Sequence, residues 1–186
     1  SATLVADIRP GISGGVNSYR HPVLNGYFYF QGNDGVSGRE LWRSNGTTAG
    51  TELVKDINTG AGDGGVYQIM VTNNTLVFQA DNGTDGREIW KSDGTDGGTT
   101  LLKDINPSGD SSPDELTEAG GKIYFSADDG TYGNEAWVTD GTAVGTFRIT
   151  DLNTTGDSDT RNFVELGSNI FFRGDDQISG DELWMY

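Results

Sequence analysis

One phrase recurs along this chain, and it constrains the fold more than any other feature. ELWRSNGTTAGTELVKDI (40–57) returns as EIWKSDGTDGGTTLLKDI (88–105) and EAWVTDGTAVGTFRITDL (135–152), and its opening returns as DELWMY (181–186). The tryptophans of the phrase lie 48, 47 and 47 residues apart, at Trp42, Trp90, Trp137 and Trp184. Repeats with periods of roughly 20–50 residues are typical of solenoids, propellers and arrays. We therefore expect four copies of one structural unit.

Each unit has the pattern of four short strands. In the second copy they are YQIMVT (67–72), TLVFQA (75–80), REIWKS (87–92) and TTLLKDI (99–105), separated by clusters of Gly, Asn and Asp. Short runs rich in aromatic and β-branched residues between such turn residues are typical of strands and hairpins. PDELTEAGG (113–121) resembles a helical turn by itself, but it aligns with YQIMVT. We therefore predict a strand there as well.

The second strand of each unit is apolar without interruption. These runs are YFYF, LVF, IYF and IFF, at 27–30, 76–78, 123–125 and 170–172. A strand covered on both faces shows this pattern, and four-stranded units of about 40–50 residues are typical of β-propeller blades. The sequence therefore predicts an all-β fold, a four-bladed β-propeller with four antiparallel strands per blade. A sandwich or a solenoid is the alternative.

The ends of the chain complement each other in this scheme. We predict a single domain, 1–186, with blades at about 9–57, 58–105, 106–152 and 153–186 plus 1–8. The last unit lacks its fourth strand, whereas ATLVADI (2–8) aligns with TELVKDI, TTLLKDI and TFRITDL. Residues 2–8 are therefore expected to complete the last blade and close the ring, which removes two open sheet edges. The alternative is a strand-swapped or side-by-side dimer that forms a larger ring.

Composition indicates a folded, turn-rich and acidic protein. The chain has 29 glycines, where average usage gives about 13. Twelve basic and 28 acidic residues give a net charge of −16, which disfavours nucleic acid and anionic membranes as partners. No apolar run approaches the roughly 20 residues that span a bilayer, so we expect no membrane insertion. Without cysteine the chain cannot form a disulfide, a thiolate nucleophile or a Cys-based metal site.

Each tryptophan of the repeat follows a glutamate by two positions, so the two side chains share one face of a strand. The four tryptophans could be sugar-stacking platforms in equivalent ligand-binding pockets. The favoured alternative makes them wedges between blades, because indole rings contribute large buried areas to cores. The glutamates must then be buried in part and must accept hydrogen bonds. They are Glu40, Glu88, Glu135 and Glu182.

Two kinds of loop recur in every unit. The loops SNGT, SDGT and TDGT are predicted to be Asx turns in which Thr47, Thr95 and Thr142 bond to the loop. Before each repeated glutamate lies an acidic loop, and carboxylates on a Gly-bent loop are the ligands that calcium prefers. Calcium is the one cofactor this pattern suggests, and metal-free Asx turns are the alternative. The candidate ligands are Asp34, Asp81, Asp128, Asp129, Asp175 and Asp176, together with the four glutamates.

We expect no enzyme, because nothing in the spacing predicts catalysis. His21 is the only histidine and lies outside the repeated pattern, and no His/Ser/Asp arrangement is suggested. Carboxylates are so frequent that no pair stands out for glycoside hydrolysis. The phosphate-binding pattern GxxxxGK is missing from the sequence.

The repeated phrase resembles the ELWxxDGT repeat family, whose units read like ADDGxxGxELWxxDGTxxGTxLVKDIxPG. GRELWRSNGT, GREIWKSDGT, GNEAWVTDGT and GDELW match it, as do VKDINTG, LKDINPSG and ADIRPG. The resemblance implies a secreted or cell-surface protein of bacterial origin with no assigned chemistry. Departures at Asn45, Ala136, FRIT (147–150) and Gln177 argue against four identical ligand sites.

Together these observations favour a non-catalytic, secreted β-propeller binding module. Multivalent glycan recognition or surface adhesion is its most concrete form, because repeated weak sites gain affinity by avidity. The expected partner is a glycan or a surface protein, and an oligomer or larger assembly is compatible with this function. One alternative is a structural building block of a surface layer, filament or complex with no small ligand. Another is a hydrolase, which would need a unique carboxylate pair in one cleft.

Overall fold

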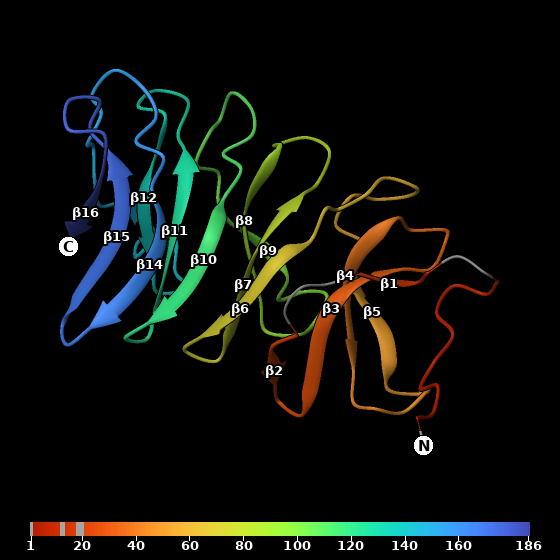
Figure 1. Ribbon diagram of the computed structural model, residues 1–186. Coiled ribbons are helices and arrows are strands. Elements are labelled where there is room, and N and C mark those ends of the chain that lie inside the picture. The colour runs from red at the N-terminus through yellow and green to blue at the C-terminus, as the bar shows by residue number, and fades with distance from the viewer. Residues whose placement is uncertain (1, 12–13, 18–20) are drawn as a thin grey trace.

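The computed structural model describes residues 2–11, 14–17 and 21–186, and it is built of strands and loops (Figure 1). This part of the chain contains no helix, and therefore none that could cross a membrane. Its strands form four separate antiparallel sheets, which follow one another in chain order. The all-β expectation is confirmed.

The sheets have similar strand orders. The first contains β1 (Val16–Asn17), β2 (Val23–Leu24), β3 (Tyr27–Asn33), β4 (Arg39–Ser44) and β5 (Thr51–Lys55), in the order β1-β3-β4-β5 with β2 also on β3. The second is β6 (Tyr67–Thr72), β7 (Thr75–Asp81), β8 (Arg87–Ser92) and β9 (Thr100–Lys103). The third is β10 (Asp114–Ala119), β11 (Lys122–Asp128), β12 (Asn134–Thr139) and β13 (Phe147–Arg148). The fourth is β14 (Arg161–Leu166), β15 (Asn169–Asp175) and β16 (Asp181–Met185).

The same register recurs in every sheet. The constant spacing between Phe and Trp places the two residues opposite each other on neighbouring strands. Phe30 stands opposite Trp42 in the first sheet, and Phe78 opposite Trp90 in the second. Phe125 and Trp137, and Phe172 and Trp184, pair alike. The acidic segment 114–119 is strand β10, as its alignment predicted. The fold is therefore one unit in four copies.

Apolar side chains are buried between successive sheets. We call the face that a sheet turns toward the next sheet its trailing face, and the opposite face its leading face. Tyr29 and Leu41, on the trailing face of the first sheet, pack with Ile69, Leu76 and Phe78 of the second. Two similar clusters lie between the second and third sheets and between the third and fourth. The core thus consists of three layers between four sheets.

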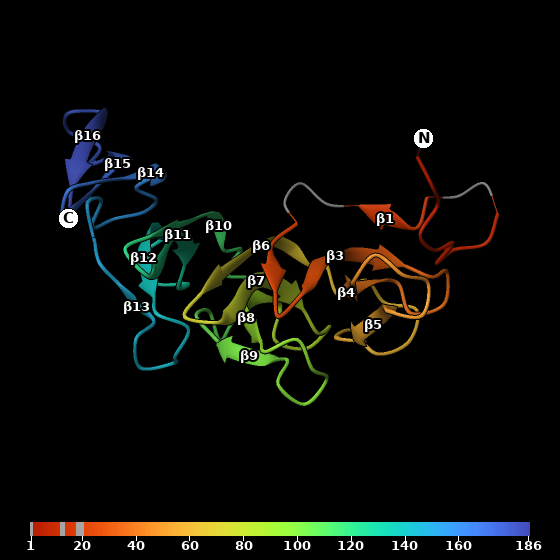
Figure 2. The same ribbon diagram turned by 90° about the horizontal axis from the view of Figure 1, so that it is seen from below.

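The expected closure of the ring by residues 2–8 is not found. These residues form no strand, and the fourth sheet has three strands in the described chain. The carbonyl of Val5 instead accepts a 2.6 Å hydrogen bond from Thr48 Oγ1 in the first sheet. The sheets form an open arc with the two termini at opposite ends (Figures 1 and 2). Residues 2–8 resemble a fourth strand in sequence, but this resemblance does not determine the angle between packed sheets. That angle decides whether four sheets close a ring.

The first strands of the last three sheets, β6, β10 and β14, lie side by side. Each contains a bulge with a non-glycine residue at positive φ, namely Gln68 (50°), Glu115 (59°) and Asn162 (57°). Gln68 Oε1 accepts the Leu116 amide at 2.7 Å, and Glu115 Oε2 accepts the Asn162 amide at 3.3 Å. Polar side chains at the bulges therefore connect neighbouring sheets.

Candidate functional site

The repeated glutamate joins one sheet to the next. Glu40 is 0% exposed. Its Oε2 accepts the Ile57 amide and its Oε1 the Gly64 amide, each at 2.8 Å. Ile57 follows the last strand of the first sheet, and Gly64 precedes β6. Related links recur: Glu88 accepts the amides of Ile105 and Ser111, and Glu135 accepts the amide of Leu152 and the hydroxyl of Ser158.

Burial changes the acidity of these carboxyls. It raises the pKa of Glu40 to about 7, against the hydrogen bonds from backbone amides, which lower it. Burial also raises the pKa of Glu88 and of Glu135, where the hydroxyls of Ser111 and Ser158 oppose the shift. Side chains with no exposed surface cannot reach a ligand in solvent, so these three glutamates are structural.

The tryptophans lie in the core. Trp42, Trp90 and Trp137 are 8%, 5% and 6% exposed, and Trp184 is partly buried against the core between the last two sheets. Trp137 Nε1 donates to the Ala127 carbonyl at 3.1 Å. Rings buried this far offer no free face for a sugar, and they occupy the place that the wedge interpretation gave them.

The candidate calcium ligands are not gathered into one site. Nowhere in the residues that the structure describes do three or more His, Cys, Asp or Glu side chains group as a metal site would require. The aspartates accept amides of their own loops, as Asp34 Oδ1 does from Val36 and Ser37 at 2.8 Å. These amides lower the pKa of Asp34. Comparable bonds occur at Asp81, Asp128, Asp129, Asp175 and Asp176. The acidic loops have the geometry of Asx turns.

A pocket of about 450 Å³ lies where β6 and β10 begin. It is lined by Gln31, Arg39, Gly65, Tyr67, Gln79, Arg87, Ser112 and Asp114. The Tyr67 side chain is 39% exposed. Arg39 Nη1 lies 3.1 Å from Asp63 Oδ2, and Arg87 Nη2 lies 2.6 Å from Asp110 Oδ2. The two guanidinium groups are therefore held in place.

Two smaller pockets continue this one in both directions. A pocket of about 190 Å³ shares Gln31 and Arg39 with it and reaches Arg9. A pocket of about 310 Å³ shares Ser112 and Asp114 with it and reaches Arg161. We call this row of three adjoining pockets the polar groove. It runs past all four sheets.

The chemistry of the polar groove changes from sheet to sheet, although the backbone does not. Tyr67, Asp114 and Arg161 take the same place in β6, β10 and β14. They stand opposite Gln79, Ser126 and Arg173 respectively. An aromatic ring, a carboxylate and a guanidinium therefore follow one another along the groove. Such a surface suits one extended ligand better than four copies of the same small ligand.

Sequence reasoning missed the polar groove because it followed the positions that the four units share. The groove is lined by positions at which the units differ, such as Tyr67, Asp114 and Arg161. Comparing the units for their differences would have identified these residues. It would not have shown that they adjoin one another.

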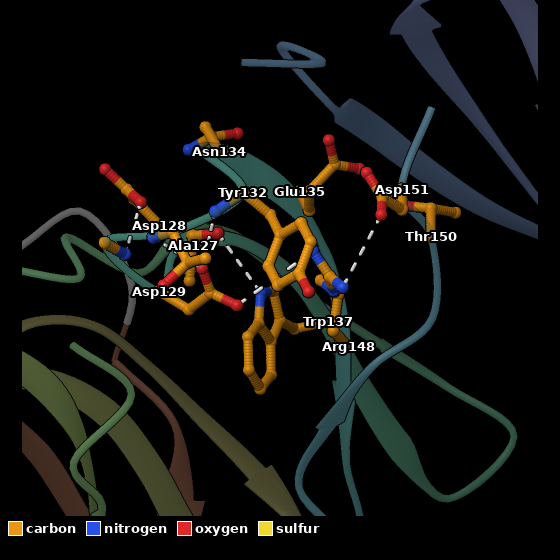
Figure 3. Close-up of polar contacts among 12 residues, drawn as sticks. Ala127, Asp128, Asp129, Tyr132, Asn134, Glu135, Trp137, Arg148, Thr150 and Asp151 are labelled. Atoms are coloured by element: carbon orange, nitrogen blue, oxygen red, sulfur yellow. Dashed lines mark hydrogen bonds and ion pairs between the residues drawn. The ribbon is translucent and has the colours of Figure 1, made fainter. Parts of the chain in front are cut away.

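The third sheet carries a further departure from the repeat (Figure 3). Arg148 stands where the other units have Leu53 and Leu101, and its guanidinium lies 3.7 Å from the centre of the Tyr132 ring. Asp129 at 4.0 Å and Asp151 at 3.7 Å flank it. The Arg148 charge is therefore compensated, because the Tyr132 ring and the two carboxylates stabilise it.

No protein-family model matches this chain, and no curated protein matches it. Among solved structures it resembles one from a study of two prolyl endopeptidases (TM-score 0.50, 13% identity), covering 86% of this chain and 24% of that one. It also resembles a puromycin hydrolase mutant complexed with PGG (TM-score 0.52, 12% identity), covering 86% and 25%. The chain spans about a quarter of each. At such low identity the structural likeness shows the fold alone, which is the sheet arrangement of propeller-containing proteins.

Proposed function

We propose that this chain is a non-catalytic binding module that recognises a glycan, and that the polar groove holds it. The observation that carries the proposal is the pocket that combines Tyr67, Arg39, Arg87, Gln79 and Asp114. Small-ligand sites are concave, about 300–1,000 Å³ in volume, and orient the ligand with a few polar groups. The central pocket, at about 450 Å³, fits that description.

These side chains match the chemistry of a sugar. A pyranose has a weakly polar C–H face, which can pack on the exposed Tyr67 ring. Its hydroxyls accept N–H donors, and Arg39 and Arg87 each keep guanidinium N–H groups beyond those that bond to Asp63 and Asp110. Asp114 and Gln79 supply acceptors for the hydroxyl protons. The flanking pockets would hold further sugar units, so affinity would accumulate along one glycan chain.

The proposal extends to the setting of the module. The four sheets are blades of a β-propeller whose ring one chain leaves open, and the chain belongs to the ELWxxDGT repeat proteins, secreted or exposed on a bacterial surface. The sheet arrangement and the repeat phrase support this part. No catalytic group is needed for it, and His21 contacts Phe28 edge-on, with 6.2 Å between the ring centres.

A glycan array tests the proposal, run once in calcium and once in EDTA. We expect hits that free sugar competes away and that persist in EDTA. Tyr67→Ala should weaken binding at least tenfold, because it removes the stacking surface. Tyr132→Ala is the matched control, since Tyr132 is 40% exposed and lies outside the polar groove.

Three results would count against the proposal in different ways. A blank array in both buffers overturns glycan binding. Hits that Tyr67→Ala leaves unchanged place the glycan elsewhere on the molecule. Hits lost in EDTA assign the site to a cation and the acidic loops.

The second candidate function is a structural building block. It is favoured by a group of exposed apolar side chains on the fourth sheet, including Val164, Leu166, Leu183 and Met185. Large exposed apolar patches mark interaction sites. A blank array together with self-association would support this function.

A further inference from the structure

The fourth sheet has a trailing face that the described chain leaves uncovered. Leu183 in β16 is 73% exposed, whereas Leu41, Ile89 and Ala136 take its place in the other sheets and are 0% exposed. The strand register extends this face, because Val164 stands opposite Phe171, which stands opposite Met185. Val164 and Met185 are 56% and 61% exposed. The face therefore carries Leu183, whose counterparts are buried in the other sheets, together with the exposed Val164 and Met185.

The molecule itself shows what covers such a face. In the first three sheets, the trailing face packs on the leading face of the next sheet, as Tyr29 and Leu41 pack on Leu76 and Phe78. The occupant with matching chemistry is thus another sheet of the same repeat.

The outer edge of β16 has no neighbouring strand in the described chain, and the repeat predicts the sequence of the strand that would pair there. In each of the other sheets, the residue after the Asp of the fourth-strand phrase donates its amide to the buried glutamate. Ile8 takes that place in ATLVADI, and its acceptor by analogy is Glu182, which is exposed. Leu4 in the same segment is 78% exposed. Residues 2–8 and the edge of β16 therefore match in sequence but lie apart.

We propose that a second copy of this chain completes the fourth sheet. The first sheet of the partner packs on the trailing face, and the partner's residues 2–8 pair with β16, so that the amide of Ile8 bonds to Glu182. Two copies do this reciprocally about a twofold axis and form one closed ring of eight sheets. A second copy fits better than the chain's own residues 2–8, because the two termini lie at opposite ends of the arc (Figures 1 and 2).

The exchange moves residues 2–8, and it also requires the partner's first sheet to uncover its leading face, where Phe30 and Trp42 are 2% and 8% exposed. Residues 2–8 form no strand in the first sheet, and the Val5 carbonyl accepts an exposed hydrogen bond from Thr48 Oγ1 of that sheet. Exchange of an identical element between protomers is a low-cost route to a dimer. The inference is independent of glycan binding, and it rests only on the sheets being propeller blades.

Disulfide trapping identifies the chain that supplies the strand, since the sequence has no cysteine of its own. Arg43 stands opposite Glu52 in the first sheet, and Met185 and Thr3 hold the matching positions. Residues directly opposite in antiparallel strands are close enough for a disulfide. We expect a mixture of the Thr3→Cys and Met185→Cys chains to form a covalent heterodimer on oxidation. A doubly substituted chain that cross-links only within itself, or no cross-link at all, overturns the proposal.

Light scattering after size-exclusion chromatography gives the second readout. The unmodified chain should elute at twice the monomer mass, and Leu183→Asp should elute as a monomer with unchanged far-UV circular dichroism. Ile178→Asp is the matched control, because Ile178 is 91% exposed in the loop before β16 and not in a strand of the trailing face, and it should leave the dimer intact. A monomeric unmodified chain, or a dimer that survives Leu183→Asp, contradicts the proposal. If the chain binds glycan as a monomer, the proposed function holds and the proposed dimer does not.

Discussion

A buried carboxyl is costly unless its oxygens accept hydrogen bonds, and Glu40 meets that condition through the amides of Ile57, Asn58 and Gly64. The donors belong to the end of one unit and the beginning of the next. The repeated glutamate is therefore a joint between sheets, and it needs no ligand to explain its recurrence.

The raised pKa of Glu40 predicts how stability depends on pH. Because the pKa in the folded protein is about 7 and the ordinary value is 4.5, the folded state binds more protons between these values. The contribution of Glu40 to the free energy of unfolding should therefore be complete below about pH 4.5 and be lost as the pH rises through 7, by about 3 kcal/mol. Urea denaturation across this range measures the slope.

A pair of variants separates Glu40 from the general acidity of the chain. Glu40→Gln should reduce the slope to the part that comes from Glu88 and Glu135, whose pKa values burial also raises, and Glu118→Gln should leave the slope unchanged, because Glu118 is exposed on β10. Equal slopes in the two variants would contradict the prediction. The lowered pKa of Asp34 acts in the opposite direction, since its contribution is lost as the pH falls below about 3.8.

At the scale of the element, the hairpin before each fourth strand has one geometry in three copies. Asp93 Oδ1 accepts the Thr95 amide at 2.9 Å and its hydroxyl at 2.7 Å, and Thr95 Oγ1 accepts the Gly98 amide at 3.0 Å. Asn45 and Asp140 make the same set of bonds in their own hairpins. The predicted Asx turns and threonine bonds are confirmed, and the change from Asp to Asn at position 45 leaves them intact.

This hairpin geometry predicts the effect of two substitutions. Asp93→Ala should lower the free energy of unfolding by about 1 kcal/mol, because two hydrogen bonds lose their acceptor. Asp93→Asn should change it by less than about 0.5 kcal/mol, because Asn45 forms the same turn. Urea denaturation at one pH compares the variants. An equal loss in both would mean that the carboxylate charge, and not the acceptor oxygen, stabilises the turn.

At the scale of the whole molecule, stability depends on which sheet faces are covered. Leu41→Ala should lower the free energy of unfolding by about 2–5 kcal/mol at any protein concentration, since Leu41 is buried between two sheets. Leu183→Ala should cost little in dilute protein, where the trailing face is bare, and more at concentrations that favour the dimer. Chemical denaturation at two protein concentrations measures both. A large loss for Leu183→Ala in dilute protein would mean that a single chain already buries Leu183.

Much of the fold could be predicted from local pattern. Strand β10 follows from aligning an acidic segment with the apolar YQIMVT, and the pairing of Phe78 with Trp90 follows from their constant spacing. The polar groove could not be predicted, because its residues come from different sheets and several of them, such as Tyr67 and Asp114, differ between units. The prediction that residues 2–8 complete the fourth sheet was wrong, since a segment can resemble a fourth strand without lying beside β16.

The sequence by itself determined the number of units, their strands, the register of the hairpins and the turns between them. These depend on contacts between residues close in the chain, where propensity and spacing dominate. Only the tertiary structure decided the burial of Trp42 and Glu40, the course of the polar groove and the open arc with its bare trailing face. Those features depend on the angle at which packed sheets meet, and side chains from both sheets set that angle together.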